Sequence, residues 1–146
     1  MKSMYRVLAY TIAVLVALQA AWVALSAFGV INAVDSGTVI DESYEPNAGA
    51  MLHGIGGMYV IPVVTLALLV VSFFAHIAGG VKWALFIVLA VALQIAFGFV
   101  AFGLPAIGLL HGVNAFVILG LAVTAAMRVS RTTASATSEP MDRTAA

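Results

Sequence analysis

The sequence predicts an all-α protein, an integral membrane bundle of four helices that run up, down, up and down. Apolar residues make up 64% of the chain and charged residues only 8%, whereas charged residues are about 25% of an ordinary soluble domain. Four stretches are also continuously apolar over roughly the 20 residues that a helix needs to cross a bilayer. Because these stretches do not alternate between polar and apolar residues, helices are favoured over a β-barrel.

The four predicted spans follow one another through short connectors, which makes sequential helices antiparallel neighbours. They are expected at residues 7–34, 48–77, 83–104 and 107–127. The first apolar run is longer than the roughly 7–15 residues of a signal-peptide core, so it is expected to remain as a span. The bundle domain is therefore residues 1–128. Residues 129–146 are rich in Ser, Thr and Ala without apolar periodicity, which predicts a disordered tail.

Positively charged residues lie on one side of the predicted bundle. They occur before the first span, between the second and third spans, and after the fourth span, at Lys2, Arg6, Lys82, Arg128, Arg131 and Arg143. The other two connectors contain no Lys or Arg. By the positive-inside rule both termini are expected to be cytoplasmic, in a bacterial inner membrane. The acidic residues Asp35, Asp41, Glu42 and Glu45 then face the outside.

Several chemistries are excluded by composition. The chain has no cysteine, which excludes disulfides, iron–sulfur clusters, covalently attached c-type haem and thiolate zinc sites. Its formal net charge is zero, so no bulk attraction to nucleic acid is expected. The lipid bilayer is the first expected partner.

Two histidines mark the candidate site. His53 and His111 each lie inside the start of an apolar stretch, in the matching contexts Leu52-His53-Gly54 and Leu110-His111-Gly112. An ionisable side chain in hydrocarbon is costly, and by default it indicates a functional site. A pair at matched depth predicts a shared ligand, and one haem iron held by an imidazole from each side is the simplest choice. Zinc or copper ligation and purely structural histidines are the alternatives.

The predicted topology places both histidines at one depth. His53 follows Pro46 by seven residues and His111 follows Pro105 by six, and proline is favoured in the first turn of a helix. With a rise of 1.5 Å per residue, each imidazole is about 10 Å below the outer start of its helix. The second and fourth spans can face each other diagonally across a four-helix core, so the two rings are expected to meet.

A weak internal repeat supports this pairing. Val16-Ala17-Leu18-Gln19 in the first span is echoed by Val91-Ala92-Leu93-Gln94 in the third. The two helical hairpins would then be related by an axis along the membrane normal. Small residues share a helical face with the histidines and predict a slot for a flat macrocycle, with ordinary helix packing as the alternative. These residues are Gly49, Gly56, Gly57, Gly108 and Ala115.

Three other polar residues within the spans have less specific interpretations. Gln19 and Gln94 lie near the middle of the first and third spans and are expected to form hydrogen bonds across the core, with contact to a bound substrate as the alternative. His76 lies about 34 Å beyond His53 along a helix. It is interpreted as an interfacial residue at the cytoplasmic end, although it could also contact a haem propionate or a quinone.

The matching stretches Leu52-His53-Gly54 and Leu110-His111-Gly112-Val113-Asn114 resemble one four-helix half of haem A synthase. The chain also resembles a group of small, uncharacterised bacterial four-span membrane proteins with a glutamine in the first and third spans and a His-x-x-Asn in the last. The resemblance covers residues 5–128. Haem A synthase joins two such bundles, whereas this chain has one. The resemblance implies a haem site near the outer face, carried onto His53 and His111.

The sequence therefore predicts a membrane protein with one haem b, ligated by His53 and His111 and used in electron transfer or redox sensing rather than in stand-alone catalysis. A quinone or a redox protein is the expected partner, as is a second copy of the chain or a larger membrane complex. Two alternatives remain open. One is a cofactor-free scaffold subunit of a complex, and the other is a membrane enzyme that modifies haem or a quinone.

Overall fold

The computed structural model describes residues 1–137, with side chains through Val129, and within that range every regular element is a helix. The elements are α1 (Lys2–Asp35), α2 (Ala48–Ile55), η1 (Gly56–Val60), α3 (Ile61–Phe74), α4 (Gly80–Gly103) and α5 (Ile107–Thr137). The segments α2, η1 and α3 follow one another without a break and together form the second long helix. Within the described residues, four helices are long and apolar enough to cross a membrane.

The helix ends differ from expectation by a few residues, with α1 beginning at Lys2 and α4 at Gly80, and two further differences have a local cause. The second long helix ends at Phe74 rather than near residue 77, and the chain then turns through His76 and Gly79, whose φ angles are 50° and 73°. Glycine adopts such a left-handed backbone without steric cost. At the other end α5 continues to Thr137, so residues 129–137, predicted to be disordered, are helical. Neither Gly nor Pro interrupts residues 121–139, and helix propagation is cheap once begun. Residues 138–146 of the predicted tail lie outside the described residues.

The second long helix contains one widened turn, at Gly56–Val60, that was not predicted from the sequence. In η1 the backbone N–H of Ile61 donates to the carbonyl of Gly56, five residues earlier, which is the pattern of a π-helix. Pro62 follows directly. Proline has no N–H, and its ring clashes with the carbonyl four residues before it in a regular helix. A wider turn relieves that clash, and it lies one turn beyond His53.

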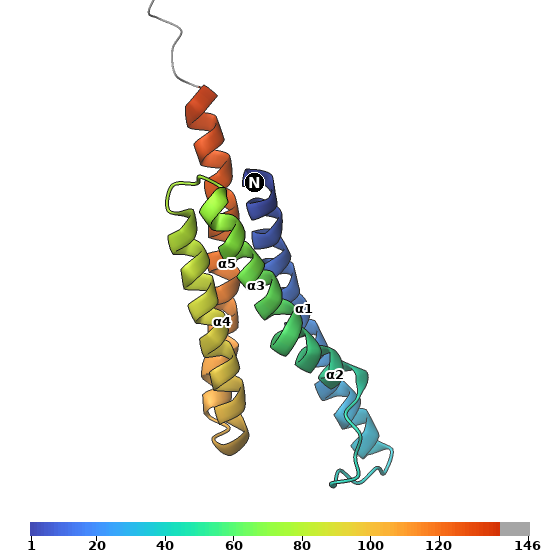
Figure 1. Cartoon of the computed structure of the whole chain (residues 1–146). Coiled ribbons are helices and arrows are strands. Elements are labelled where there is room, and N and C mark those ends of the chain that lie inside the picture. The colour runs from blue at the N-terminus through green and yellow to red at the C-terminus, as the bar shows by residue number, and fades with distance from the viewer. Residues whose placement is uncertain (138–146) are drawn as a thin grey trace, which may run out of the picture.

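The four long helices pack in a ring, in which α1 lies against α3 and α5, and α4 lies against the same two helices. The α1–α2/α3 pair and the α4–α5 pair form two hairpins that separate toward the end carrying residues 36–47 and 104–106 (Figure 1). The second and fourth long helices therefore lie on a diagonal of the ring, as the histidine pairing requires.

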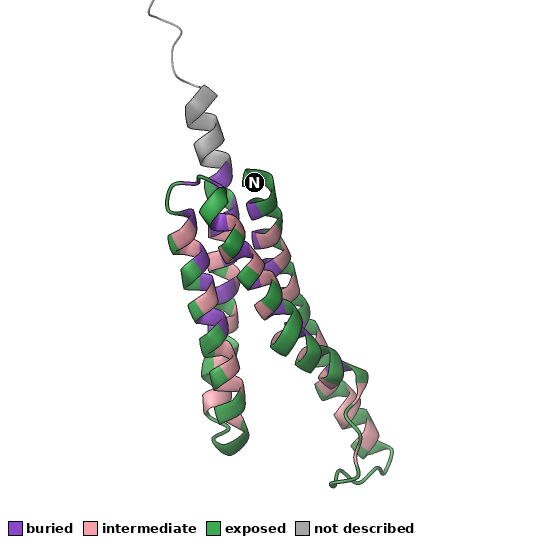
Figure 2. Ribbon diagram, in the orientation of Figure 1, coloured by how far each residue is buried: buried purple, intermediate pink, exposed green. Residues whose placement is uncertain are grey.

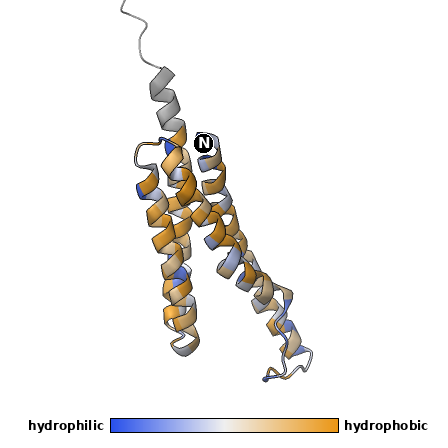
Figure 3. Ribbon diagram, in the orientation of Figure 1, coloured by the Kyte–Doolittle hydropathy of each residue, from blue (hydrophilic) through white to orange (hydrophobic). Residues whose placement is uncertain are grey.

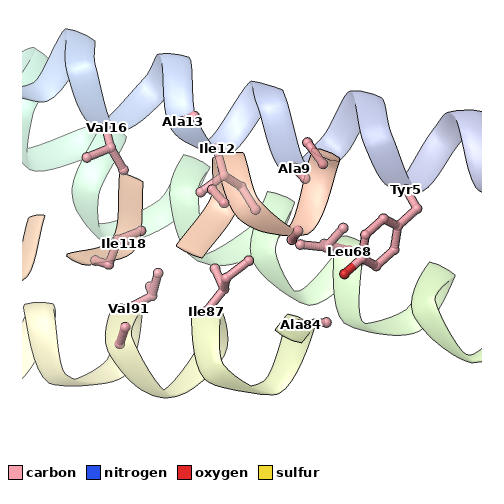
Figure 4. Close-up of a cluster of buried hydrophobic side chains, with 14 of the residues drawn as sticks. Tyr5, Ala9, Ile12, Ala13, Val16, Leu68, Ala84, Ile87, Val91 and Ile118 are labelled. Carbon is pink, nitrogen blue, oxygen red and sulfur yellow. The ribbon is translucent and has the colours of Figure 1, made fainter. Parts of the chain in front are cut away.

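The buried core lies at the opposite end, near the N-terminus and the connector between α3 and α4 (Figure 2). Figure 4 shows its side chains from α1, α3, α4 and α5 packed together, including Ile12, Leu68 and Ile87. The hydroxyl of buried Tyr5 donates to the carbonyl of Gly80 at 3.0 Å, which ties the start of α1 to the start of α4. This end holds the two hairpins together and leaves the other end free to separate.

The outward faces of the helices are also apolar (Figure 3). Large hydrophobic side chains are exposed along every long helix, with Phe28 at 71%, Phe102 at 89% and Phe116 at 76% of full exposure. Contact between so much apolar surface and water is unfavourable, and a soluble monomer rarely carries apolar patches larger than a few hundred Å². The described fold is thus typical of a multi-pass membrane protein.

Candidate functional site: a histidine pair between the two hairpins

The two predicted histidines meet where the hairpins begin to separate. His53 comes from α2 and His111 from α5, and their ring centroids are 6.1 Å apart with an angle of 61° between the ring planes. Both side chains are half-buried. A metal ion bound by one nitrogen from each ring would lie about 2 Å from each nitrogen. The separation of the ring centroids is therefore compatible with one ligand shared by the two rings.

Helix α2 is held in place by its N-cap. Asn47 accepts a hydrogen bond from the backbone N–H of Ala50 at 3.1 Å, and its Nδ2 donates to the carbonyl of Ser26 in α1 at 2.9 Å. Asparagine is among the best N-cap residues because its oxygen satisfies a free N–H of the first turn. The same side chain thus begins α2 and binds it to α1, which sets the height of His53 relative to the bundle.

His111 is held by a main-chain group. Its Nδ1 lies 3.0 Å from the carbonyl oxygen of Gln94 in α4. A carbonyl oxygen only accepts hydrogen bonds, so Nδ1 carries the ring proton. Nε2 of the neutral ring is then bare, meaning that it has no proton, and an unprotonated nitrogen is the one that binds a metal. Asn114, one turn further along α5, donates from Nδ2 to the carbonyl of Ala90 and to Oε1 of Gln94, both at 2.8 Å.

His53 is held by a side chain instead. With the amide of Gln19 in the orientation that satisfies both of its ends, Nε2 donates to the carbonyl of His53 at 3.0 Å and to its Nδ1 at 2.6 Å. Oε1 of the same amide accepts from the N–H of Gly57 at 3.3 Å. Gln19 is 9% exposed, and its amide thus joins α1 to the widened turn of the second long helix.

A cavity of about 360 Å³ opens beside the two rings, lined by residues of all four long helices. Ligand pockets of proteins typically measure about 300–1,000 Å³. Apart from the histidines and the two glutamines the lining is apolar, and it includes the largely exposed Phe99 and Phe102. Exposed lining residues mean that the cavity opens at the outer surface of the bundle, on the side where the hairpins separate.

The small residues predicted to line a cofactor slot divide into two groups. Gly57, Gly108 and Ala115 line the cavity. Gly49 and Gly56 do not, because they face α1: a Cβ at Gly49 would collide with the backbone of Ser26, and one at Gly56 with the amide of Gln19. For these two the close approach of α1 is what requires glycine, so the helix-packing alternative accounts for them.

The cavity lining also contains residues that the sequence interpretation missed. Gly98 is the most informative, since a Cβ built there would lie 3.4 Å from Nδ1 and Cε1 of His111. Gly98 is one helical turn beyond Gln94, and residues four apart share a helix face. That spacing is a signal that could have identified it. The other missed lining residues are mostly apolar and carry no such signal, among them Val16, Met58, Val91, Ile95, Phe99 and Ile118.

The remaining candidates lie away from the pair. His76 is exposed in the connector after α3, and its Nδ1 lies 3.0 Å from the carbonyl of Phe74. The acidic residues of the 36–47 connector are exposed as well, and hydrogen bonds from the hydroxyl and backbone N–H of Ser43 hold the pKa of Asp41 below its usual range. Within the described part of the chain, no three His, Cys, Asp or Glu side chains gather around a point that could hold a metal ion.

Fold and site together define an all-helical protein of four membrane-length helices with a histidine pair beside an apolar cavity. Comparisons with protein-family models, curated proteins and solved structures find no match to this chain.

Proposed function

We propose that the protein is an integral membrane haem protein in which His53 and His111 hold one b-type haem. The observation that carries this proposal is the 6.1 Å separation of two imidazoles from diagonal helices. An electron carrier of this type binds its iron through a histidine on each face of the macrocycle. We place the bundle in a bacterial inner membrane in the up-down-up-down arrangement, with both termini cytoplasmic, because Lys2, Arg6, Lys82 and Arg128 lie toward one end of the described helices.

The residues of the site fit this group. The macrocycle supplies the in-plane ligands of its iron, so the protein needs to add only two, whereas structural zinc sites use four protein ligands. The described residues provide two imidazoles and no third candidate. The apolar lining suits a porphyrin, and Gly57 and Gly108 remove side-chain bulk where a flat group would approach the helices. His111 already presents an unprotonated Nε2, since its Nδ1–H donates to the main-chain carbonyl of Gln94.

Bound haem would supply one-electron chemistry. With both faces of its iron occupied by imidazole, the site suits electron transfer or redox sensing better than oxygen activation. The chain's own residues orient the rings, exclude water through the apolar lining, and open a path to the surface beside Phe99 and Phe102. A single site near the outer face cannot carry electrons across the bilayer alone, so we propose a quinone, a redox protein, a second copy of the chain or a larger complex as partner.

An absorption spectrum of the detergent-purified protein tests this proposal. Protein titrated with haem should bind one equivalent and show the sharp low-spin bands of a bis-histidine complex in both the oxidised and reduced states. A His53→Ala, His111→Ala double variant serves as the control for haem that partitions into detergent. If the two proteins take up the same amount of haem with the same spectrum, the proposal is wrong, and a cofactor-free scaffold or a quinone-binding protein becomes the better interpretation.

A further inference from the structure

The two histidines are held in opposite ways. A carbonyl oxygen faces Nδ1 of His111, whereas the amide N–H of Gln19 faces Nδ1 of His53. Neutral imidazole carries one proton, on one nitrogen or the other. A ring that donates from Nδ1 leaves Nε2 bare, and a ring that accepts at Nδ1 carries its proton on Nε2. His111 therefore has a bare Nε2, while Nε2 of His53 bears a proton.

Gln19 keeps this orientation because its amide also has two backbone partners. Its Nε2 donates to the carbonyl of His53 at 3.0 Å, and its Oε1 accepts from the N–H of Gly57 at 3.3 Å. Turning the amide over would place oxygen against oxygen and N–H against N–H, so these two backbone groups determine which atom faces the ring of His53.

Gln94 at the matching position of α4 does not do the same. Its side-chain oxygen accepts from Asn114, and its main-chain oxygen holds His111. The two halves of the internal repeat thus place a glutamine and a histidine at equivalent positions but connect them through different atoms. This asymmetry separates the roles of the two glutamine side chains, and it supplies a matched control.

We propose that Gln19 is a positioning residue that selects the protonation form of His53, so that the neutral site pairs an N–H on His53 with a bare nitrogen on His111. One consequence rests on the proposed haem function. If His53 held the iron through Nε2, its ring proton would be on Nδ1 and would need an acceptor. The Gln19 amide would then have to turn over to present Oε1, giving up its bonds to the backbone of His53 and Gly57. The proton would only change ring nitrogens, so no net proton would be released.

Nitrogen NMR of the haem-free protein tests the selection directly. The chain has three histidines, so ¹⁵N-histidine labelling in a His76→Ala background leaves two rings to assign, at a pH of about 8.5 where ordinary imidazoles are neutral. We expect the protonated nitrogen to be Nε2 in His53 and Nδ1 in His111. Gln19→Met keeps the length of the side chain but removes its hydrogen bonds, and His53 should become a mixture of both forms. Gln94→Met should leave His111 unchanged, because a main-chain oxygen holds that ring.

If both rings of the parent protein carry the proton on Nδ1, or if Gln19→Met leaves the signals of His53 unchanged, the proposal is overturned. A haem titration then tests the consequence. Loss of an outer hydrogen-bond partner of a metal ligand typically costs about 10–100-fold in affinity, and we expect that loss in Gln19→Met and recovery in Gln19→Glu, which still offers an accepting oxygen. Failure of the parent protein to bind haem would contradict the proposed function, while the NMR result decides the role of Gln19 independently.

Discussion

His53 and His111 lie with their ring centroids 6.1 Å apart, although one belongs to the first hairpin and the other to the second. Both rings line the apolar cavity. Toward the N-terminus the hairpins share a buried core, and toward the 36–47 connector α1 and the second long helix separate from α4 and α5 (Figures 1 and 2). The pair therefore marks the boundary between the part of the bundle that holds its shape and the part that can admit a ligand.

The first prediction concerns the ligands. His53→Ala and His111→Ala should each abolish the low-spin haem spectrum, because a single imidazole cannot occupy both faces of the iron. His76→Ala should bind haem as the parent does, since His76 is exposed in the connector after α3. Spectra of the three purified variants, each at the same protein concentration, measure this. Unchanged haem content in both of the first two variants would remove the site from this pair.

The second prediction separates cavity from packing by comparing adjacent glycines. Gly57 lines the cavity, and a Cβ there meets only the side-chain amide of Gln19 at an ordinary 3.6 Å. Gly57→Leu should thus insert into membranes and unfold within about 1–3 kcal/mol of the parent, the usual range for an enlarged core residue, yet bind little haem. Haem-to-protein ratios and thermal unfolding in detergent measure the two effects.

Gly56→Leu is the counterpart of that variant. A Cβ at Gly56 would collide with the Gln19 amide and lie 2.7 Å from Cζ3 of Trp22, so the helix must move away from α1. We expect a clearly lower unfolding temperature than for Gly57→Leu, with haem binding lost as a consequence. Full haem occupancy in Gly57→Leu, or equal stability of the two variants, would contradict this assignment of the two faces.

The third prediction concerns Gly98, which lies against the ring of His111. A methyl group at 3.4 Å from Nδ1 and Cε1 is tighter than most contacts, so Gly98→Ala should displace the ring and weaken its bond to Gln94. We expect haem affinity to fall several-fold with a shifted low-spin electron paramagnetic resonance signal. Gly112→Ala is the matched control, because nothing lies within 4 Å of its Cβ. Alanine there should stabilise α5 by up to about 1 kcal/mol and leave the spectrum unchanged.

The fourth prediction concerns topology. The Lys and Arg residues that flank the helices, such as Lys82 and Arg128, lie toward the end that carries the N-terminus and the connector between α3 and α4 (Figure 1). That end should face the cytoplasm. A reporter active only outside the cytoplasm should therefore be inactive when fused after Arg131 and active when inserted in the 36–47 connector. The reverse pattern would invert the bundle and place the histidine pair near the cytoplasmic face.

Much of this molecule follows from local sequence. Continuous apolar runs longer than 18 residues predict the four long helices, and the structure contains them, with ends displaced by a few residues and α5 extended to Thr137. Matched spacing from Pro46 and Pro105 predicted that His53 and His111 lie at one level, and the structure brings their rings together. These features depend on helical rise and on where apolar runs begin, both of which are properties of a short segment.

Tertiary structure decided what each side chain meets. Gly56 and Gly57 are neighbours in the sequence, yet the rotation of the second long helix turns one toward α1 and the other toward the cavity. That rotation depends on the widened turn before Pro62 and on how α1 packs against it, which periodicity alone does not contain. The same packing places the side-chain amide of Gln19 against the ring of His53 and the main-chain carbonyl of Gln94 against the ring of His111. Equivalent sequence positions therefore acquired different chemistry, because hydrogen bonds depend on the distances between helices and not on residue type alone.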